Sequence, residues 1–259
     1  MDLGIAGRKA IVCASSRGLG KACARALAEA GCTVVINGRD QKRLEAVAAE
    51  MASQTGVKVI PVVADVSTPE GQKALLSVCP QPDILVNNNA GPPLRDFRDL
   101  TRQQMLDGVV ANMVSAIELI QKVIDPMCER KFGRIVNITS GTVKMPLAGL
   151  DLSSGARAGL TAFLAGVART VAGNNVTVNN ILPGAFDTDR LRGTLAKAAE
   201  QKGITLEEAA KARAAGIPAG RFGEPDEFGA ACAFLCSSKA GYITGQNLLI
   251  DGGVFNGAF

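Results

Sequence analysis

Few side chains in this sequence of 259 residues are able to do acid–base or nucleophilic chemistry. It contains no His and no Trp, and its single Tyr is Tyr242. A Ser-His-Asp triad, a Cys-His pair and a His-ligated zinc site all need an imidazole, so the composition excludes them. Chemistry must therefore come from Ser, Lys, Arg, Asp, Glu, Asn, Cys or that one Tyr.

A turn of small residues follows the first apolar run and leads into an amphipathic segment. The free N–H groups and the dipole of a helix N-terminus favour a phosphate. The turn lacks the G-x-G-x-x-G spacing of the common dinucleotide fingerprint, so its glycines alone are weak evidence. The candidate phosphate-binding residues are Ser15, Ser16, Arg17, Gly18, Leu19 and Gly20.

The end of the second apolar run indicates which dinucleotide this turn would bind. Enzymes for the unphosphorylated cofactor usually carry an acidic side chain there, which binds the ribose 2′-hydroxyl. Here the run ends at Asn37, and Arg39 follows. Arg39 and Arg17 together could clamp a 2′-phosphate, which favours NADP(H). The alternatives are that both are solvated surface charges, or that Asp40 binds the unphosphorylated cofactor.

Short runs rich in Val and Ile alternate with amphipathic segments along the whole chain. Unbroken apolar runs are typical of parallel strands covered on both faces, and the alternation predicts right-handed crossovers. We therefore expect one α/β domain over residues 1–259, a Rossmann-type doubly wound parallel sheet of about seven strands with helices on both faces. The expected strands are 9–14, 33–37, 57–63, 84–87, 134–138, 176–182 and 247–250. The expected helices are 19–30, 41–54, 69–78, 101–111 leading into 115–129, 154–171 and 226–236.

Residues 188–218 interrupt this alternation. They hold two helical pieces, 190–201 and 206–214, and no strand. Ligands of open α/β sheets bind outside the carboxyl ends of the strands, so a segment that follows such an end is placed to cover a substrate. A plain pair of surface helices is the alternative.

Charge and hydropathy argue against several classes of protein. The net charge is +4 without a dense basic run, which disfavours nucleic acid as a partner. No uninterrupted apolar stretch reaches the roughly 18 residues of a membrane span, and residues 1–5 do not resemble a signal peptide. The odd number of seven cysteines, mostly in apolar contexts and without further metal ligands nearby, indicates reduced thiols in the core of a cytoplasmic protein that holds no metal.

Six segments, in order, resemble the short-chain dehydrogenases/reductases, and most of all the β-ketoacyl-acyl-carrier-protein reductase branch. The resemblance covers the whole chain and implies a cytoplasmic homotetramer or homodimer that uses NADP(H). Two positions depart from the pattern, because Ala14 replaces the first glycine and Asn89-Ala90 stands where Ala-Gly is usual. The segments are residues 14–20, 64–66, 83–91, 133–140, 183–188 and 221–225, the last leading to 244–245 and 251–253.

The same resemblance implies a set of cofactor contacts. Asp65 and Val66 would flank the adenine, and the turn after the fourth strand would support the cofactor. A proline-glycine segment after the sixth strand would hold the nicotinamide. The remaining cofactor residues so implied are Asn88, Asn89, Ala90, Gly91, Ile138, Arg157, Pro183, Gly184, Phe186 and Thr188.

The catalytic positions are where the chain departs most from this family. In the family a Ser polarises the carbonyl, a Tyr transfers the proton, a Lys four residues later lowers the pKa of the Tyr, and an Asn anchors a water chain. Ser140 and Asn112 match the Ser and the Asn, but the Tyr position is Ser153 and the Lys position is Arg157. A serine hydroxyl is much less acidic than a phenol, and an arginine is a poor proton donor.

Lys144 offers a replacement donor. We expect its ammonium to be partly buried beside Arg157, where its pKa would fall to a useful value. It would then supply the proton directly or through Ser153 and water, while Ser140 and Arg157 stabilise the alkoxide. The alternative is that Lys144 is a solvated loop residue.

The sequence therefore predicts an NADP(H)-dependent oxidoreductase that reduces a small carbonyl or acyl substrate through a non-standard proton donor. One alternative is a cofactor-binding protein that has lost hydride transfer and acts as a sensor or structural subunit. Another is a non-redox enzyme, an epimerase or dehydratase, that reuses the nicotinamide. Residues 109–124 and 154–171 are long enough to pack against a second copy of the chain, or they simply cover the sheet.

Overall fold

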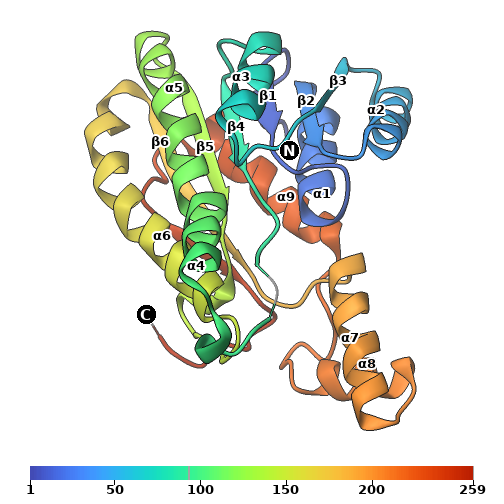
Figure 1. Cartoon of the computed structure of the whole chain (residues 1–259). Coiled ribbons are helices and arrows are strands. Elements are labelled where there is room, and N and C mark those ends of the chain that lie inside the picture. Colours follow the sequence, from blue (N-terminus) through green and yellow to red (C-terminus); the bar gives the residue numbers. More distant parts are fainter. Residues whose placement is uncertain (93, 259) are drawn as a thin grey trace.

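The computed structural model describes residues 1–92 and 94–258. Seven parallel strands form one sheet in the order β3-β2-β1-β4-β5-β6-β7, and helices cover both of its faces (Figure 1). This confirms the predicted doubly wound sheet. The strands are β1 (Lys9–Val12), β2 (Thr33–Gly38), β3 (Val59–Val63), β4 (Ile84–Asn87), β5 (Gly133–Ile138), β6 (Val176–Pro183) and β7 (Asn247–Ile250).

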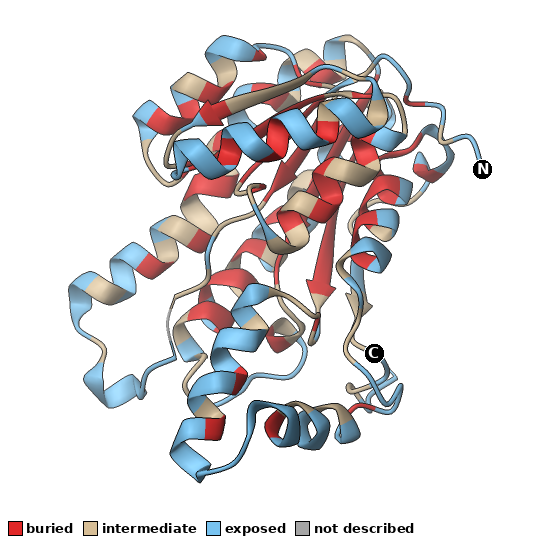
Figure 2. Cartoon of the chain, turned by 90° about the vertical axis from the view of Figure 1, so that its right-hand side faces the viewer, coloured by how far each residue is buried: buried red, intermediate tan, exposed pale blue. Residues whose placement is uncertain are grey.

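The helices divide between two hydrophobic cores, one on each face of the sheet. Successive strand residues point to opposite faces, so Leu85 belongs to one core and Val86 to the other. Figure 2 shows the strands almost wholly buried between the helical layers. One layer is α1 (Gly18–Glu29), α2 (Gln41–Thr55) and α9 (Pro225–Cys236); the other is α3 (Pro69–Val78), α5 (Ser115–Glu129) and α6 (Asp151–Val171).

Two element boundaries differ from the prediction in ways that matter for the site. Strand β1 ends at Val12 because Ala14 turns the chain with a φ of 45°. Helix α6 begins at Asp151, so Ser153 lies inside its first turn and not before it. Helix α4 (Arg102–Val109) continues into α5 through a π-helical turn, Val110–Val114, which the periodicity did not indicate.

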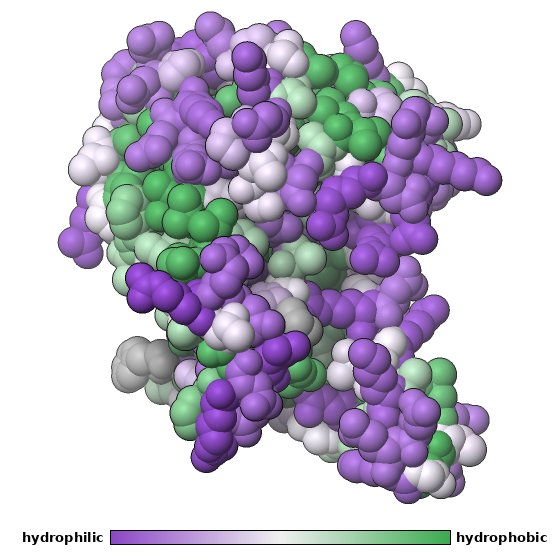
Figure 3. Space-filling view, in the orientation of Figure 1, coloured by the Kyte–Doolittle hydropathy of each residue, from purple (hydrophilic) through white to green (hydrophobic). Residues whose placement is uncertain are grey.

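The predicted insertion forms the paired helices α7 (Asp189–Lys202) and α8 (Leu206–Ala215). The pair projects from the rest of the molecule, and few of its side chains are buried (Figures 1 and 2). In the space-filling view the surface is indented where α7 joins the body, and hydrophilic residues cover most of the pair (Figure 3).

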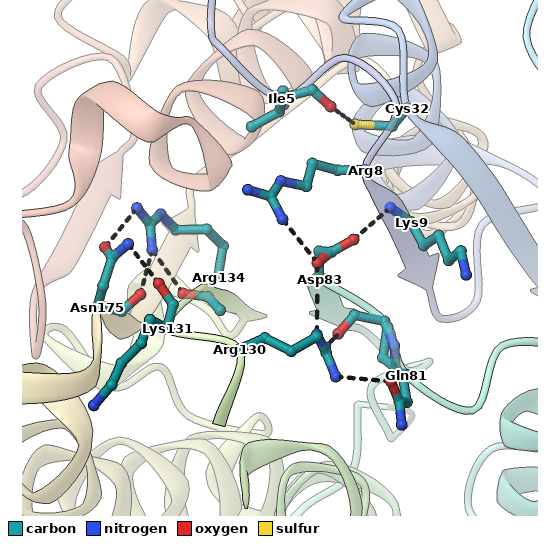
Figure 4. A network of polar contacts seen from close by, with 12 residues as sticks. Ile5, Arg8, Lys9, Cys32, Gln81, Asp83, Arg130, Lys131, Arg134 and Asn175 are labelled. Atoms are coloured by element: carbon teal, nitrogen blue, oxygen red, sulfur yellow. Dashed lines mark hydrogen bonds and ion pairs between the residues drawn. The ribbon is translucent and has the colours of Figure 1, made fainter. Parts of the chain in front are cut away.

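An arginine network closes the amino-terminal edge of the sheet (Figure 4). Asp83 accepts hydrogen bonds from Arg8 Nη1 at 3.2 Å and from the backbone N–H of Lys9 at 3.0 Å. Arg134 is 1% exposed, and its guanidinium donates to the carbonyls of Ser237, Gly133 and Asn175 and to the Asn175 side chain. The guanidiniums of Arg8 and Arg134 also lie 3.8 and 4.5 Å from the ring centroid of Phe132.

All seven cysteines are free thiols, and all but Cys128 are buried. In the part of the chain that the structure describes, no helix is long and apolar enough to cross a bilayer.

Candidate active site

The predicted site residues gather at the carboxyl edge of the sheet. Most lie in the loops that follow β1 to β6, while Asn112 lies in the π-helical turn and Ser153 and Arg157 lie on α6. The strand order reverses between β1 and β4. Open α/β sheets bind ligands at such a reversal.

The first loop leaves the start of α1 free for an anion. Helix α1 has no side-chain cap and no acidic residue in its first turn, and Arg17 is exposed at its N-cap. The buried hydroxyl of Ser15 donates to the Val12 carbonyl and accepts from the Asn37 N–H, so this side chain shapes the turn instead of facing a ligand. A Cβ on Gly20 would lie 2.4 Å from the Ala14 carbonyl oxygen, so only glycine lets the helix approach this closely.

The loop after β2 presents cations without a free carboxylate. The Asn37 side chain accepts from the Ala14 N–H and donates to the carbonyls of Val62 and Ala64, so it is already occupied. Asp40 caps α2 by accepting from the Arg43 N–H at 3.0 Å. Arg39 is exposed beside this loop. Arg39 is therefore available for the contact with a 2′-phosphate that the sequence predicts, and this contact stays a prediction.

Asp65, which the resemblance places beside the adenine, is held in a fixed position by its neighbours. Its Oδ1 accepts from the backbone N–H of Ser67 at 2.9 Å, and its Oδ2 lies 3.5 Å from Arg39 Nη1. The hydrogen bonds from Ser67, with the Arg39 charge adding, keep the pKa of Asp65 below its usual value. The next residue, Val66, is buried.

The asparagine turn after β4 bridges the two halves of the sheet. Asn88 Nδ2 donates to the Ala14 carbonyl at 3.1 Å, and Asn89 Nδ2 donates to the Ala111 carbonyl at 3.0 Å. The turn is thereby fixed to the phosphate-binding loop on one side and to the π-helical turn on the other.

The loop after β6 approaches the first loop from the opposite side. The Thr188 methyl group would lie 3.7 Å from a Cβ on Gly18, and Thr188 Oγ1 caps α7. Gly184 packs against Asp251, where a Cβ would lie 2.6 Å from the Asp251 Cβ. The Phe186 ring is buried and stacks edge-to-face on Phe228, 5.2 Å between centroids, so only its backbone faces the site.

Arg157 connects the two candidate catalytic serines. Its Nε donates to Ser153 Oγ at 3.2 Å, and its Nη1 donates to the carbonyls of Ile138 and Thr139 at 2.7 and 2.8 Å. Thr139 directly precedes Ser140. Burial, with the neighbouring charge of Arg190 adding, lowers the pKa of Arg157 to about 10.

The two serine hydroxyls keep their protons available. Ser140 Oγ accepts from the N–H and from the hydroxyl of Thr142, at 3.1 and 2.9 Å. Ser153 is 7% exposed, and its Oγ accepts from Arg157 Nε. Because Ser140 Oγ accepts from the Thr142 N–H and Ser153 Oγ from Arg157, each hydroxyl can turn its proton toward a ligand.

Asn112 lies beside a small polar cavity. It sits in the π-helical turn, a local distortion that often marks functional sites. Its Nδ2 donates to the Gly108 carbonyl, while its Oδ1 and that of Asn87 have no partner among the described residues. Both residues and Arg157 line a cavity of about 20 Å³, which is enough for one water molecule.

The expectation that Lys144 is partly buried beside Arg157 is wrong. Its side chain is exposed, and its Nζ lies 5.4 Å from the ring centroid of Phe255. The cation next to Arg157 is Arg190. The Lys144 side chain extends into solvent because an ammonium loses its hydration when it is buried beside another cation.

A larger cavity of about 330 Å³ adjoins this cluster. Ala90 and Pro92 line it on one side and Leu152, next to Ser153, on another. Asn112 lines both this cavity and the smaller one. The volume lies in the range of small-molecule sites.

Two features of the site were not predicted. Arg190 of α7 reaches across to Gly91, although nothing in its sequence neighbourhood marks it. An in-register ladder of side-chain amides also crosses four strands, in which Asn87 donates to Asn137, Asn137 to Asn180 and Asn180 to Asn247. Asparagine at the same level of adjacent strands was the available signal for the ladder.

The family model described as enoyl-(acyl carrier protein) reductase matches residues 13–255. The chain is 32% identical to the 3-oxoacyl-[acyl-carrier-protein] reductase FabG of Aquifex aeolicus, over 98% of this chain and 100% of that protein. It is also 32% identical to the NADPH-dependent reductase BacG of Bacillus subtilis, over 95% of this chain and 97% of that protein.

A solved structure also matches this chain over nearly its whole length. L-sorbose reductase from Gluconobacter frateurii, in complex with NADPH and L-sorbose, superposes with a TM-score of 0.94 at 29% identity, over 99% of this chain and 100% of that one. The match in sequence and fold runs essentially end to end. The chain therefore belongs to the short-chain dehydrogenase/reductase family of oxidoreductases and resembles its 3-oxoacyl-acyl-carrier-protein reductases.

Proposed function

We propose that this chain reduces the carbonyl group of a small substrate with NADPH, using Ser153 and Arg157 in place of a Tyr and a Lys. The observation that carries the proposal is that Arg157 hydrogen-bonds Ser153 and, at the same time, the backbone next to Ser140. The reductases among the relatives and the cations at residues 17 and 39 support the choice of cofactor.

Bound NADPH would supply the hydride. The hydroxyls of Ser140 and Ser153 would both donate to the carbonyl oxygen, since Thr142 and Arg157 already occupy their acceptor sides. Donors fixed in this way stabilise the negative charge that develops on that oxygen.

Ser153 would then pass its proton to the alkoxide and take one from Arg157 Nε. Arginine is ordinarily a poor proton donor, but burial, with the charge of Arg190 adding, lowers the pKa of Arg157 to about 10. Its guanidinium is then a stronger acid than a serine hydroxyl or an alcohol, so the transfer runs toward the product. A water molecule in the 20 Å³ cavity between Arg157 and Asn112 would relay a proton from bulk solvent to Arg157, which restores the guanidinium. Lys144 has no part in this route, because its ammonium is exposed and packs on Phe255.

The cofactor would lie across the carboxyl edge from Asp65 to Thr188. The start of α1 and Arg17 would hold the pyrophosphate, and Arg39 would hold the 2′-phosphate. Residues 188–218 would close over the substrate as a lid, with the substrate in the 330 Å³ cavity. The other proposed contacts are Ser16, Gly18, Leu19, Val66, Asn88, Asn89, Ala90, Gly91, Ile138, Pro183, Gly184 and the Phe186 backbone.

The protein would work as a homodimer or homotetramer. One proposed face is α6 around Phe163, and the other is the edge strand β7 around Leu248, because both side chains are apolar and exposed. Two such faces on one chain would pair with the same faces of other copies about two-fold axes. Light scattering compares the mass of the oligomer in Phe163→Glu and in Leu248→Glu with that of the wild type. A lower mass shows that the substituted face holds copies of the chain together.

Turnover of a panel of ketones and acyl thioesters tests the proposed reaction. Ser153→Ala should lower kcat about 100-fold with the affinity for NADPH unchanged, because a general acid contributes at least that much. Lys144→Ala is the matched control and should keep kcat within about twofold. A wild-type protein that binds NADPH but turns over nothing would favour a sensor or structural subunit instead.

A further inference from the structure

Two guanidiniums meet over one glycine at the mouth of the site. A Cβ on Gly91 would lie 3.0 Å from both Nη atoms of Arg190 and 3.5 Å from Arg157 Nη2. Arg157 is 7% exposed, whereas Arg190 is exposed on the first turn of α7. The missing side chain at Gly91 is what lets both cations reach the same point.

Neither cation has a carboxylate partner. Among residues 1–92 and 94–258, no acidic side chain forms an ion pair with Arg157 or Arg190. Asp189, the residue before Arg190, forms no ion pair with it, and Asp187 is taken by Arg192 in a two-pronged contact at 2.8 and 2.9 Å. Like charges held together without an acid repel one another, so an arrangement of this kind favours an anionic ligand.

The cations lie where a bound substrate would extend. Ala90 and Pro92, on either side of Gly91, line the 330 Å³ cavity, and so does Arg95, which also has no ion pair in the described chain. The one carboxylate lining that cavity, Asp107, accepts a hydrogen bond from Gln103. A carbonyl held at Ser153, next to Leu152 of the cavity wall, would place the rest of its molecule beside these arginines.

From this geometry we infer that the substrate is an oxo acid, whose carboxylate is bound by Arg190 and Arg157 beside Gly91. The planar fork of a guanidinium matches the two oxygens of a carboxylate. The inference rests on the proposed carbonyl reduction and adds that the substrate carries a negative charge. An anionic group of the cofactor, its pyrophosphate, is the other source of the same chemistry, and the experiment separates the two.

The test compares acids with their own methyl esters. Probes are 2-oxopentanoate, 4-oxopentanoate and 5-oxohexanoate and their methyl esters, so that the members of each pair differ by the negative charge and one methyl group. At least one acid should have a kcat/KM tenfold or more above its ester. Arg190→Gln should remove most of that advantage, while Arg192→Gln, an exposed arginine on the same helix that is paired with Asp187, should leave it intact.

Each outcome decides the inference. If the wild type reduces every ester as well as its acid, the inference is overturned and carbonyl reduction stands. A rise in the KM for NADPH in Arg190→Gln, with the acid–ester ratio unchanged, assigns the anion to the cofactor and also overturns it.

Binding separates this inference from the proposed reaction if no probe is turned over. Titration calorimetry of the acids and esters into the protein loaded with NADP⁺ should then show binding of the acid alone, which Arg190→Gln removes. Such binding without turnover contradicts the proposed reaction but supports the carboxylate site. Equal binding of acid and ester, or of wild type and Arg190→Gln, overturns the inference.

Discussion

Both edges of the sheet hold clustered arginines, but only the cluster at the amino edge includes an acidic partner. At the amino edge the guanidinium of Arg134 donates to four acceptors and Arg8 pairs with Asp83 (Figure 4). At the carboxyl edge Arg157 and Arg190 face one another without an acid.

Other groups do not separate the two edges. Left-handed backbone occurs at Ala14 on the carboxyl side and at Lys131 and Asn175 on the amino side. Buried side-chain oxygens without a partner among the described residues occur at Asn87 and Asn112 on the carboxyl side and at Thr177 near the start of β6. The difference therefore lies in the clustered arginines: those at the amino edge are paired and stabilise the fold, whereas those at the carboxyl edge lack an acidic partner and are available to a ligand.

The largest effect is expected at the amino edge. Arg134→Leu would leave the carbonyls of Ser237, Gly133 and Asn175 short of a buried donor, which should lower the free energy of unfolding by about 3 kcal/mol. Urea unfolding measures this change, with the exposed Arg169→Leu on α6 as control. A loss no larger than that of the control would break the contrast between the edges.

The pH dependence of the reaction probes the carboxyl edge. Since burial lowers the pKa of Arg157 to about 10 and its protonated form is the one that donates, kcat for reduction should hold below that pH. Above it kcat should fall about tenfold per pH unit. Initial rates from about pH 7 to about pH 11, with circular dichroism at each pH to exclude unfolding, check this. A decline centred near neutrality would assign the proton to another group.

A substitution at the carboxyl edge should stabilise the protein. Ala14 has a φ of 45°, a conformation that costs a non-glycine residue about 1 kcal/mol, so Ala14→Gly should raise the free energy of unfolding by about that amount. Thermal unfolding measures it. Ala26→Gly, inside α1, is the control and should shift stability in the opposite direction. A loss of stability in Ala14→Gly would show that the turn is not strained.

The smallest effect is expected from the unpaired arginines of the carboxyl edge. Removing the exposed charge of Arg190 relieves its repulsion with Arg157, so Arg190→Gln should raise the free energy of unfolding by about 0.3 kcal/mol. The gain should disappear at high salt, because exposed charges are screened. Arg192→Gln breaks the contact with Asp187 and should give no gain at either salt concentration.

Periodicity and residue type predicted the sheet, the phosphate turn and the cation at Arg39, whereas the other site loops and the catalytic positions were implied by the resemblance to the family. Runs such as 84–87 and 134–138 are typical of strands covered on both faces, and the phosphate turn follows from its place after the first strand. The π-helical turn at Val110–Val114 shares its apolar pattern with an ordinary helix, so the pattern did not indicate it.

Contacts between distant loops could not be predicted. Lys144 has no periodic neighbours that would fix its direction, and Arg190 meets Gly91 only because β4 and β6 end at the same edge. The hydrogen bond from Arg157 to Ser153 was within reach of sequence reasoning, since the two residues are four apart on one helix. The expected start of that helix, at residue 154, placed Ser153 outside it.

Transfer of deuterium tests the central claim, that this edge still performs reduction through Ser153 and Arg157. The protein is incubated with NADPH deuterated at C4 and the oxo acid that turns over fastest, and the alcohol is analysed by mass spectrometry. We expect deuterium in the alcohol with the wild type, and a rate about 100-fold lower with Ser153→Ala. No label in any product, or an equal rate with Ser153→Ala, would contradict the claim.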